Sequence, residues 1–203
     1  DHYKTMEKYV EAKQRIFRNQ KKDDILICNV QCLPESAICP STLLKAGVNE
    51  PDTELCVAEE PDGTWIHFRD KAYRIPVDEI RLLGQHNYFD IGVVYGVCSI
   101  LGMDDGAFTA GLKTYEPLPH RLQYLGERDG VKYYDDSIST ICDTTIQALK
   151  TLKDTDTVLI GGMDRGIDYR ELIEYLSECQ VRHIILMEAT GKRIYQEIYK
   201  FYP

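Results

Sequence analysis

Residues 157–187, TVLIGGMDRGIDYRELIEYLSECQVRHIILM, decide the fold class of this chain. Two short apolar runs, Thr157–Ile160 and His183–Met187, flank the segment Tyr169–Glu178, whose apolar residues recur at helical spacing. Strands that alternate with helices at this spacing are typical of a parallel, doubly wound sheet, so we expect an α/β fold. Further helical patterns come before and after this stretch, at Ile141–Leu152 and Thr190–Phe201.

The first half of the chain predicts a similar mixture. Thr5 is a plausible N-cap for a helix that begins near Met6, and Asp24–Asn29 reads as a buried strand. Short strands at Thr64–Phe68 and Ala72–Ile75 predict a hairpin at a sheet edge. Two helices are expected next, a buried one at Asn87–Leu101, which is apolar on most faces, and a second at Asp104–Tyr115.

The sequence Glu116-Pro117-Leu118-Pro119 interrupts this pattern and is the best candidate for a linker. It divides the chain into two expected domains, residues 1–116 and 117–203. A second hairpin, Leu122–Glu127 with Val131–Tyr134, is predicted directly after the linker.

Composition excludes several classes of protein. The 203 residues are 43% apolar and 28% charged, which favours a folded domain over a disordered chain. A net charge of -9 argues against nucleic-acid binding, and the apolar runs are too short for membrane insertion. Seven scattered cysteines indicate reduced thiols and a cytoplasmic location. Zinc binding by Cys28, Cys32 and Cys39 is a weak alternative, since the spacing lacks a CxxC pair.

Two loops at the carboxyl ends of predicted strands carry polar residues. Asp135-Asp136-Ser137-Ile138-Ser139-Thr140 could contact a ribose or a phosphate, although capping of the next helix is the simpler interpretation. Gly161–Gly166 lets a backbone approach a ligand, and Arg165 could hold a carboxylate, although a plain loop with a solvated arginine is the simpler interpretation. Ala189–Lys192 lacks the spacing of a phosphate-binding P-loop.

Two more polar clusters lie in apolar surroundings. Gly84–Asn87 lies at the start of the helix expected to be buried. Side-chain amides at this position could contact a nucleotide base, or His86 could simply cap the helix. Pro119-His120-Arg121 lies at the interdomain break, a usual place for a pocket, although Arg121 could also be a surface cation.

Taken in order, these clusters and the stretch Glu11–Phe17 resemble the second half of a Mur ligase, the ATP-dependent amide-forming enzymes of peptidoglycan synthesis. The resemblance covers essentially the whole chain and is closest to the members that add glutamate to UDP-N-acetylmuramoyl-L-alanine. It implies the C-terminal part of a central ATP-binding domain followed by a Rossmann-like C-terminal domain that is truncated. The family's GKT or GKS loop is absent here, so this chain alone is expected to be inactive.

The resemblance also implies roles for individual residues. Lys13 matches a lysine that becomes a carbamate and then binds magnesium, so it is the expected catalytic and metal-binding residue. ATP would contact residues of both domains, which closure brings together. The nucleotide-binding set is His86, Asn87, Asp90, Arg121 and Asp136, and the substrate-binding set is Ser137, Thr140 and Arg165.

Three positions depart from the family pattern. Asp90 stands where the helix motif usually has a second Asn, and a carboxylate cannot donate a hydrogen bond as an amide does. Ile138 replaces a lysine and Ile141 an asparagine in the motif that reads DSISTI here, and Arg165 replaces a frequent lysine. Loss of a cation beside a phosphate weakens anion binding unless another residue compensates.

The resemblance implies ADP-forming ligation through an acyl phosphate, which requires ATP and Mg²⁺. The implied partners are UDP-N-acetylmuramoyl-L-alanine and glutamate, and a monomer is expected. Two alternatives stay open. One is a glutamate ligase similar to folylpolyglutamate synthase. The other is a non-catalytic nucleotide-binding module derived from a ligase, which the departures at Asp90 and Ile138 motivate. The sequence does not distinguish D-glutamate from L-glutamate.

Overall fold

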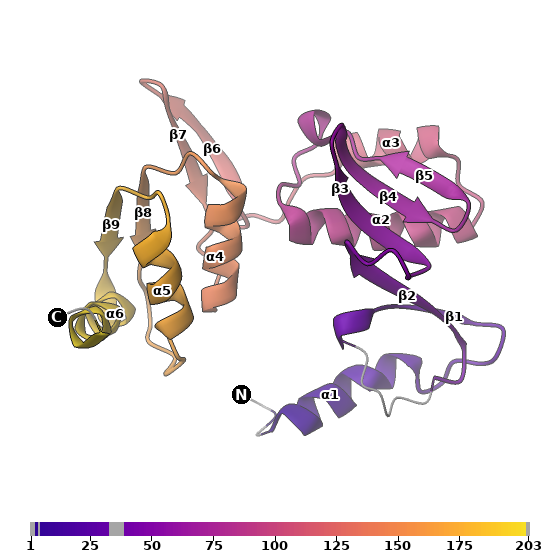
Figure 1. Ribbon diagram of the computed structural model, residues 1–203, viewed down its shortest axis with the longest axis horizontal. Helices are drawn as coiled ribbons and strands as arrows, with labels where there is room; N and C mark the ends of the chain where they lie inside the picture. Colours follow the sequence, from indigo (N-terminus) through magenta and orange to yellow (C-terminus); the bar gives the residue numbers. More distant parts are fainter. Residues whose placement is uncertain (1–2, 4, 33–38, 202–203) are drawn as a thin grey trace. The chain divides into compact units, whose positions relative to one another are not determined.

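The computed structural model describes residue 3 and residues 5–32 and 39–201, drawn in Figure 1. The chain forms two compact units. The first contains residues up to Ile80 together with Asn87–Thr114, and the second contains Arg81–His86 together with residues from Tyr115 onward. The segment Arg81–His86 thus belongs with the second unit, where Gly84 lies close to Thr151. The domain boundary expected after residue 116 stays a prediction.

A mixed five-stranded sheet organises the first unit (Figure 1). The strands pair in sequence order, the first three in parallel and the last three antiparallel. The predicted strand near residue 25 and the edge hairpin are confirmed, whereas the second and third strands were not predicted. The five are β1 (Ile25–Asn29), β2 (Thr42–Val48), β3 (Leu55–Glu60), β4 (Gly63–Phe68) and β5 (Lys71–Arg74).

Helix α2 (Gln85–Ile100) packs against this sheet through two glycines. A Cβ added at Gly92 would lie 2.5 Å from Val57, and one added at Gly96 would lie 2.7 Å from Leu55. Because glycine has no Cβ, the helix approaches the buried first residues of β3 closely. The opposite side of α2 is open, with Val94 53% and Val97 44% exposed, so the prediction of a buried helix holds for one face only.

An aromatic cluster closes the core of the first unit. Tyr73 of β5 stacks on Tyr95 of α2 with ring centroids 4.9 Å apart, and Phe108 of α3 (Asp105–Thr114) packs edge-on against both rings. The Tyr95 hydroxyl donates to Asp105 at 3.0 Å, and burial is the main reason that the pKa of Tyr95 is raised. The predicted second helix is therefore confirmed.

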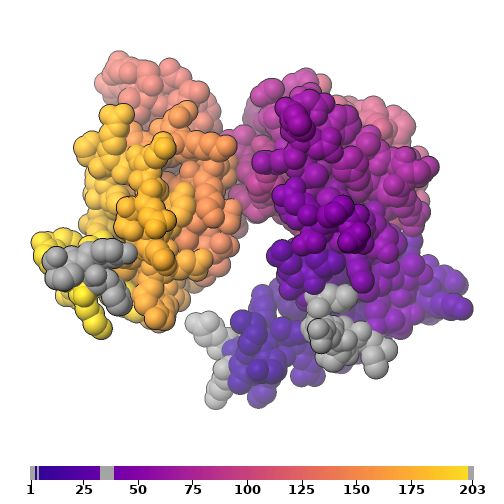
Figure 2. Space-filling view, in the orientation of Figure 1, coloured from indigo at the N-terminus to yellow at the C-terminus, as the bar shows by residue number. Residues whose placement is uncertain are grey.

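Helix α1 (Met6–Gln14) lies on the surface of the first unit, in indigo in Figure 2. Thr5 caps it as predicted, since its hydroxyl accepts a hydrogen bond from the Lys8 amide at 3.4 Å. A turn of 3₁₀-helix, Arg15–Phe17, extends it. Met6 is 70% exposed, so the apolar side chains of this helix are not part of the core.

The second unit contains the predicted alternation of strands and helices. Strands β8 (Thr157–Ile160) and β9 (His183–Leu186) pair in parallel, and the core includes Ile146, Leu172 and Ile194. The hairpin β6 (Gln123–Arg128) and β7 (Val131–Asp135) is antiparallel and forms a separate sheet. Most of its side chains are exposed and do not share this core. The helices are α4 (Cys142–Thr151), α5 (Arg170–Glu178) and α6 (Glu188–Phe201).

Candidate functional site

Two loops of the second unit are joined where the sequence predicted a nucleotide contact. The Leu122 amide donates to Asp136 Oδ1 at 3.0 Å, and the Ile138 amide donates to the His120 carbonyl at 3.3 Å. Both His120 and Leu122 adopt positive φ, of 64° and 43°. The loop that carries Arg121 is thereby held beside the loop that carries Asp136.

A hydrogen bond between His120 and Asp135 adds to this junction. The His120 Nδ1 and Asp135 Oδ2 atoms are 2.7 Å apart, and the Ser137 amide donates to Asp135 Oδ1 at 2.9 Å. The hydrogen bond from His120 is the main cause that lowers the pKa of Asp135 to about 2, and the Ser137 amide adds to it. Sequence reasoning did not single out this pair, although both residues lie in clusters that it had flagged.

The carboxylate of Asp136 binds the loops rather than helix α4. Its Oδ2 accepts a hydrogen bond from the Ser139 hydroxyl, while Oδ1 accepts from Leu122. The helix begins six residues after Asp136, at Cys142, and its N-cap residue Ile141 makes no side-chain capping bond. Capping of α4 by this cluster, the simpler interpretation of the sequence, is therefore wrong. Each carboxylate oxygen has two lone pairs, so Asp136 can still accept a bond from a ligand.

The remaining predicted residues of the second unit lie in loops. Ser137 and Thr140 are exposed in the segment between β7 and α4. Arg165 is exposed in the loop Gly161–Gly166 that follows β8, and its guanidinium makes no hydrogen bond or ion pair with any residue that the structure describes. These side chains are accessible to a ligand.

The predicted residues of the first unit are divided between two helices. Asn87 and Asp90 are three residues apart near the start of α2, a spacing that places them on neighbouring parts of the helix surface. His86 precedes them and belongs with the second unit. Lys13 lies in the last turn of α1, where its Nζ is 5.3 Å from the centroid of the Tyr9 ring. The structure joins the loops that carry Arg121, Asp136 and Ser137, and it places Lys13 and Asn87 on separate helices.

Comparison with known proteins identifies the family. The Mur ligase middle domain matches residues 1–98. A UDP-N-acetylmuramoylalanine--D-glutamate ligase of Staphylococcus haemolyticus is 34% identical over 185 residues, which is 89% of this chain and 40% of the relative. The chain belongs to the Mur ligase family. The corresponding ligase of Geobacter sp. (strain M21) is 32% identical and aligns with 98% of this chain and 44% of its own length. This Mur ligase chain thus spans less than half of these curated relatives.

Solved structures show the Mur ligase fold. MurF ligase from Thermotoga maritima in complex with ADP has a TM-score of 0.69 at 18% identity, covering 94% of this chain and 46% of the other. MurC from the same organism has a TM-score of 0.66 at 16% identity, covering 98% and 45%. The α/β fold expected from the resemblance is confirmed.

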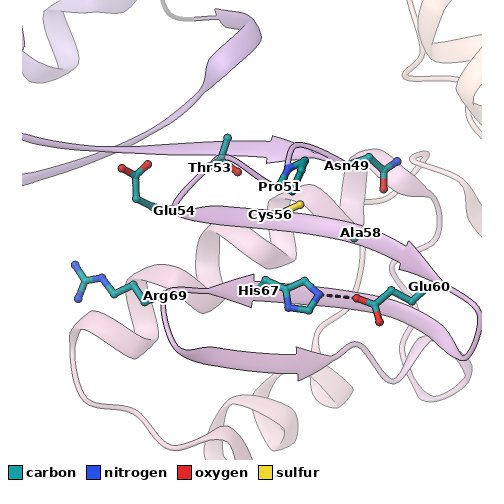
Figure 3. Close-up of a pocket in the computed structure, with 9 residues that line it drawn as sticks. All are labelled: Asn49, Pro51, Thr53, Glu54, Cys56, Ala58, Glu60, His67 and Arg69. Carbon is teal, nitrogen blue, oxygen red and sulfur yellow. Dashed lines mark hydrogen bonds and ion pairs between the residues drawn. The ribbon is translucent and has the colours of Figure 1, made fainter.

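One groove of this Mur ligase chain was not expected from the sequence. It has a volume of about 470 Å³ and lies on strands β3 and β4 (Figure 3). His67 Nε2 and Glu60 Oε1 are 2.6 Å apart within it, and Cys56 and Arg69 are also part of its wall. Every predicted site residue lies outside the lining of this groove.

The described residues form neither a cluster of metal ligands nor a helix that could span a membrane. Within residues 5–32 and 39–201, no three His, Cys, Asp or Glu side chains are grouped so that they could hold a metal ion. All seven cysteines are free thiols. Over the same part of the chain, each helix is too short or too polar to cross a bilayer.

Proposed function

We propose that this chain is the nucleotide- and amino-acid-binding part of an ATP-dependent, ADP-forming ligase that adds glutamate to UDP-N-acetylmuramoyl-L-alanine. Relatives named as D-glutamate ligases, 32–34% identical over 89–98% of the chain, support this substrate pair. We further propose that the enzyme acts in the cytoplasm, as a monomer, in peptidoglycan synthesis.

The junction between the loops at residues 118–122 and 135–139 is the observation that carries this proposal. Three contacts join them: Leu122 to Asp136, Ile138 to His120, and His120 to Asp135. A guanidinium from one loop and a carboxylate from the other suit the two polar parts of a nucleotide, since arginine pairs with phosphate and a carboxylate accepts from ribose hydroxyls. Arg121 would bind the phosphates and Asp136 the ribose.

ATP also needs contacts for its base. His86, Asn87 and Asp90 lie in the first turns of α2. An imidazole, an amide and a carboxylate can each form hydrogen bonds with the edge of a base. The donor and acceptor set of this chain therefore fits ATP. Mg²⁺ would be held by Lys13 after its neutral amine captures carbon dioxide as a carbamate and loses a proton, because this turns a cation into an oxygen ligand of the kind that Mg²⁺ prefers.

The amino-acid substrate would meet the exposed loops of the second unit. Arg165 can pair with a carboxylate of glutamate, and the hydroxyls of Ser137 and Thr140 can donate to it. In the reaction, the terminal carboxylate of UDP-N-acetylmuramoyl-L-alanine accepts the γ-phosphoryl group and ADP leaves. The glutamate amine then attacks the acyl carbon, phosphate departs, and an amide remains. Mg²⁺ held by the Lys13 carbamate would supply positive charge that offsets the charge of the transferred group.

The experiment measures ADP release by the whole protein. UDP-N-acetylmuramoyl-L-alanine is supplied with D-glutamate, L-glutamate or neither, and a folate substrate replaces the nucleotide sugar in a parallel assay. Release that needs both the sugar nucleotide and one glutamate enantiomer supports the proposal. Release with folate identifies the folylpolyglutamate-type alternative, and no release with any pair contradicts ligase function.

Two arginine variants test the nucleotide contact. Arg121→Met should raise the KM for ATP by on the order of tenfold or more, because a charge-assisted phosphate contact is lost. Arg128→Met is the matched control, since Arg128 is 85% exposed at the tip of the β6–β7 hairpin. Equal KM values for ATP in the two variants would count against the role of Arg121.

A further inference from the structure

The loop that presents Arg165 is fixed by a cluster of side chains that the sequence did not reveal. Asp164, the residue before Arg165, accepts three hydrogen bonds on Oδ1: from the Gly166 amide at 2.9 Å, from the Tyr169 hydroxyl at 3.2 Å and from Arg193 Nη1 at 3.0 Å. These bonds are the reason that the pKa of Asp164 is lowered, the Gly166 amide being the largest cause. Asp164 therefore remains ionised and oriented.

Arg193 reaches this loop from helix α6. Its Nη2 donates to the Ile167 carbonyl at 2.8 Å, its Nε donates to Glu197 at 3.0 Å, and its guanidinium lies 4.9 Å from the centroid of the Tyr169 ring. Arg193 is 31% exposed and Tyr169 only 4%. A planar guanidinium with this many partners is held in one orientation.

The backbone on either side is held as well. The Thr190 amide, in the first turn of α6, donates to the Gly162 carbonyl at 3.1 Å. A Cβ added at Gly161 would lie 2.7 Å from the Met187 carbonyl oxygen, so the loop passes close to the end of β9. The backbone at Gly162, the Asp164 side chain and the backbone at Ile167 are thus all held by α6, and Arg165 lies between them with an exposed side chain.

We infer that Arg193 and Asp164 are positioning residues for the amino-acid substrate, acting through Arg165. This inference rests on the proposed function, since it assumes that Arg165 binds a carboxylate of glutamate. A flexible arginine loses side-chain and loop entropy when it binds, whereas a loop ordered in advance avoids much of that cost. Loss of the Arg193 contacts should therefore weaken glutamate binding and leave ATP binding unchanged.

The test compares KM values for the whole protein. Arg193→Met should raise the KM for glutamate by on the order of tenfold, with the KM for ATP within about twofold, as expected for a misplaced binding group. Arg193→Lys keeps a cation that can reach Asp164 and should recover part of the loss. Arg182→Met is the matched control, because Arg182 is 80% exposed and pairs only loosely with Asp156, at 3.5 Å.

A double-mutant cycle distinguishes positioning from a general structural role. If Arg193 acts through Arg165, the double variant Arg193→Met/Arg165→Met should have the same KM for glutamate as Arg165→Met alone. Additive increases in the KM for glutamate, or an unchanged KM in Arg193→Met, would overturn the inference. The proposed function would still stand if the wild type shows glutamate-dependent turnover. Absence of glutamate-dependent turnover in the wild type overturns both. Where Arg193→Met does not melt cooperatively, the same comparison is made with Arg193→Lys.

Discussion

The backbone amide of Leu122 donates to the carboxylate of Asp136 at 3.0 Å across 14 positions of sequence. One carboxylate therefore joins two loops, and its remaining lone pairs can still accept a hydrogen bond. The same Asp136 carboxylate joins the two loops and is proposed to bind the ribose, so the two roles must be separated by different variants.

We expect Asp136→Ala to raise the KM for ATP, because both the ribose contact and the loop junction are lost. Asp136→Asn keeps an amide oxygen that can accept from Leu122, so the junction is largely kept. The KM for ATP measured in both variants checks this, and Ser139→Ala is the control for the second oxygen, which accepts the Ser139 hydroxyl. Unchanged nucleotide affinity in Asp136→Ala would exclude the ribose assignment.

A pH dependence follows from the pair of His120 and Asp135. The folded-state pKa of Asp135 is about 2, below the value of about 3.9 for an unfolded chain. A depressed carboxyl pKa stabilises the fold above the unfolded pKa, and this contribution is lost as the pH falls from about 4 to about 2. The denaturation midpoints of wild type and Asp135→Asn, measured from pH 6 to pH 2, should therefore converge at the acid end. Parallel curves over that range would contradict the hydrogen bond of His120 to Asp135.

The glycines of α2 provide a stability prediction with an internal control. Gly92→Ala should destabilise the protein by about 1–3 kcal/mol, because the new Cβ would lie 2.5 Å from Val57 Cγ2, in a fully buried part of the core. Gly111→Ala lies in α3, where no described atom outside the local helix is within 4 Å of the added Cβ, so a gain of about 0.5–1 kcal/mol is expected. Chemical denaturation of the two variants measures both changes. Equal effects would mean that α2 does not approach β3 closely.

Local patterns explain which parts of the fold could be predicted from the sequence. The second-unit helices α4 and α5 follow from periodicity, because their buried residues, such as Ile146, Leu172 and Leu176, recur at helical spacing. Strand β3 was missed because its apolar run is short: Leu55, Cys56 and Val57 are buried, and after Ala58 the strand ends in two glutamates. Helix α2 was predicted to be buried because it is apolar on most faces, yet Val94 is exposed. Burial at Val94 depends on which elements pack against the helix, and the helical pattern does not contain that information.

The candidate site shows the same division. Sequence patterns flagged the loops that carry Asp136 and Arg165, since polar residues after strands are a local signal. The Arg121 cluster was flagged by its position at the predicted linker. These signals did not reveal the bonds between loops, because these join residues 14 to 29 positions apart, such as Asp164 and Arg193. Positive φ at two non-glycine residues, His120 and Leu122, decides the shape of the first loop, and composition gives no sign of it.

The proposed carbamate on Lys13 makes a prediction that separates chemistry from charge. Lys13→Ala should reduce ligation by on the order of a hundredfold or more, because the group that would hold Mg²⁺ and stabilise the transferred phosphoryl charge is removed. Added short carboxylate ions should restore part of the activity, since they replace the missing oxygens. Lys8→Ala is the matched control: Lys8 is an exposed lysine of the same helix, α1, and the sequence gives it no catalytic role. Turnover is measured in the whole protein with saturating ATP. Near-normal turnover in Lys13→Ala, or equal losses in the two variants, would refute the carbamate role, because an ordinary surface lysine stabilises the helix end only through its charge.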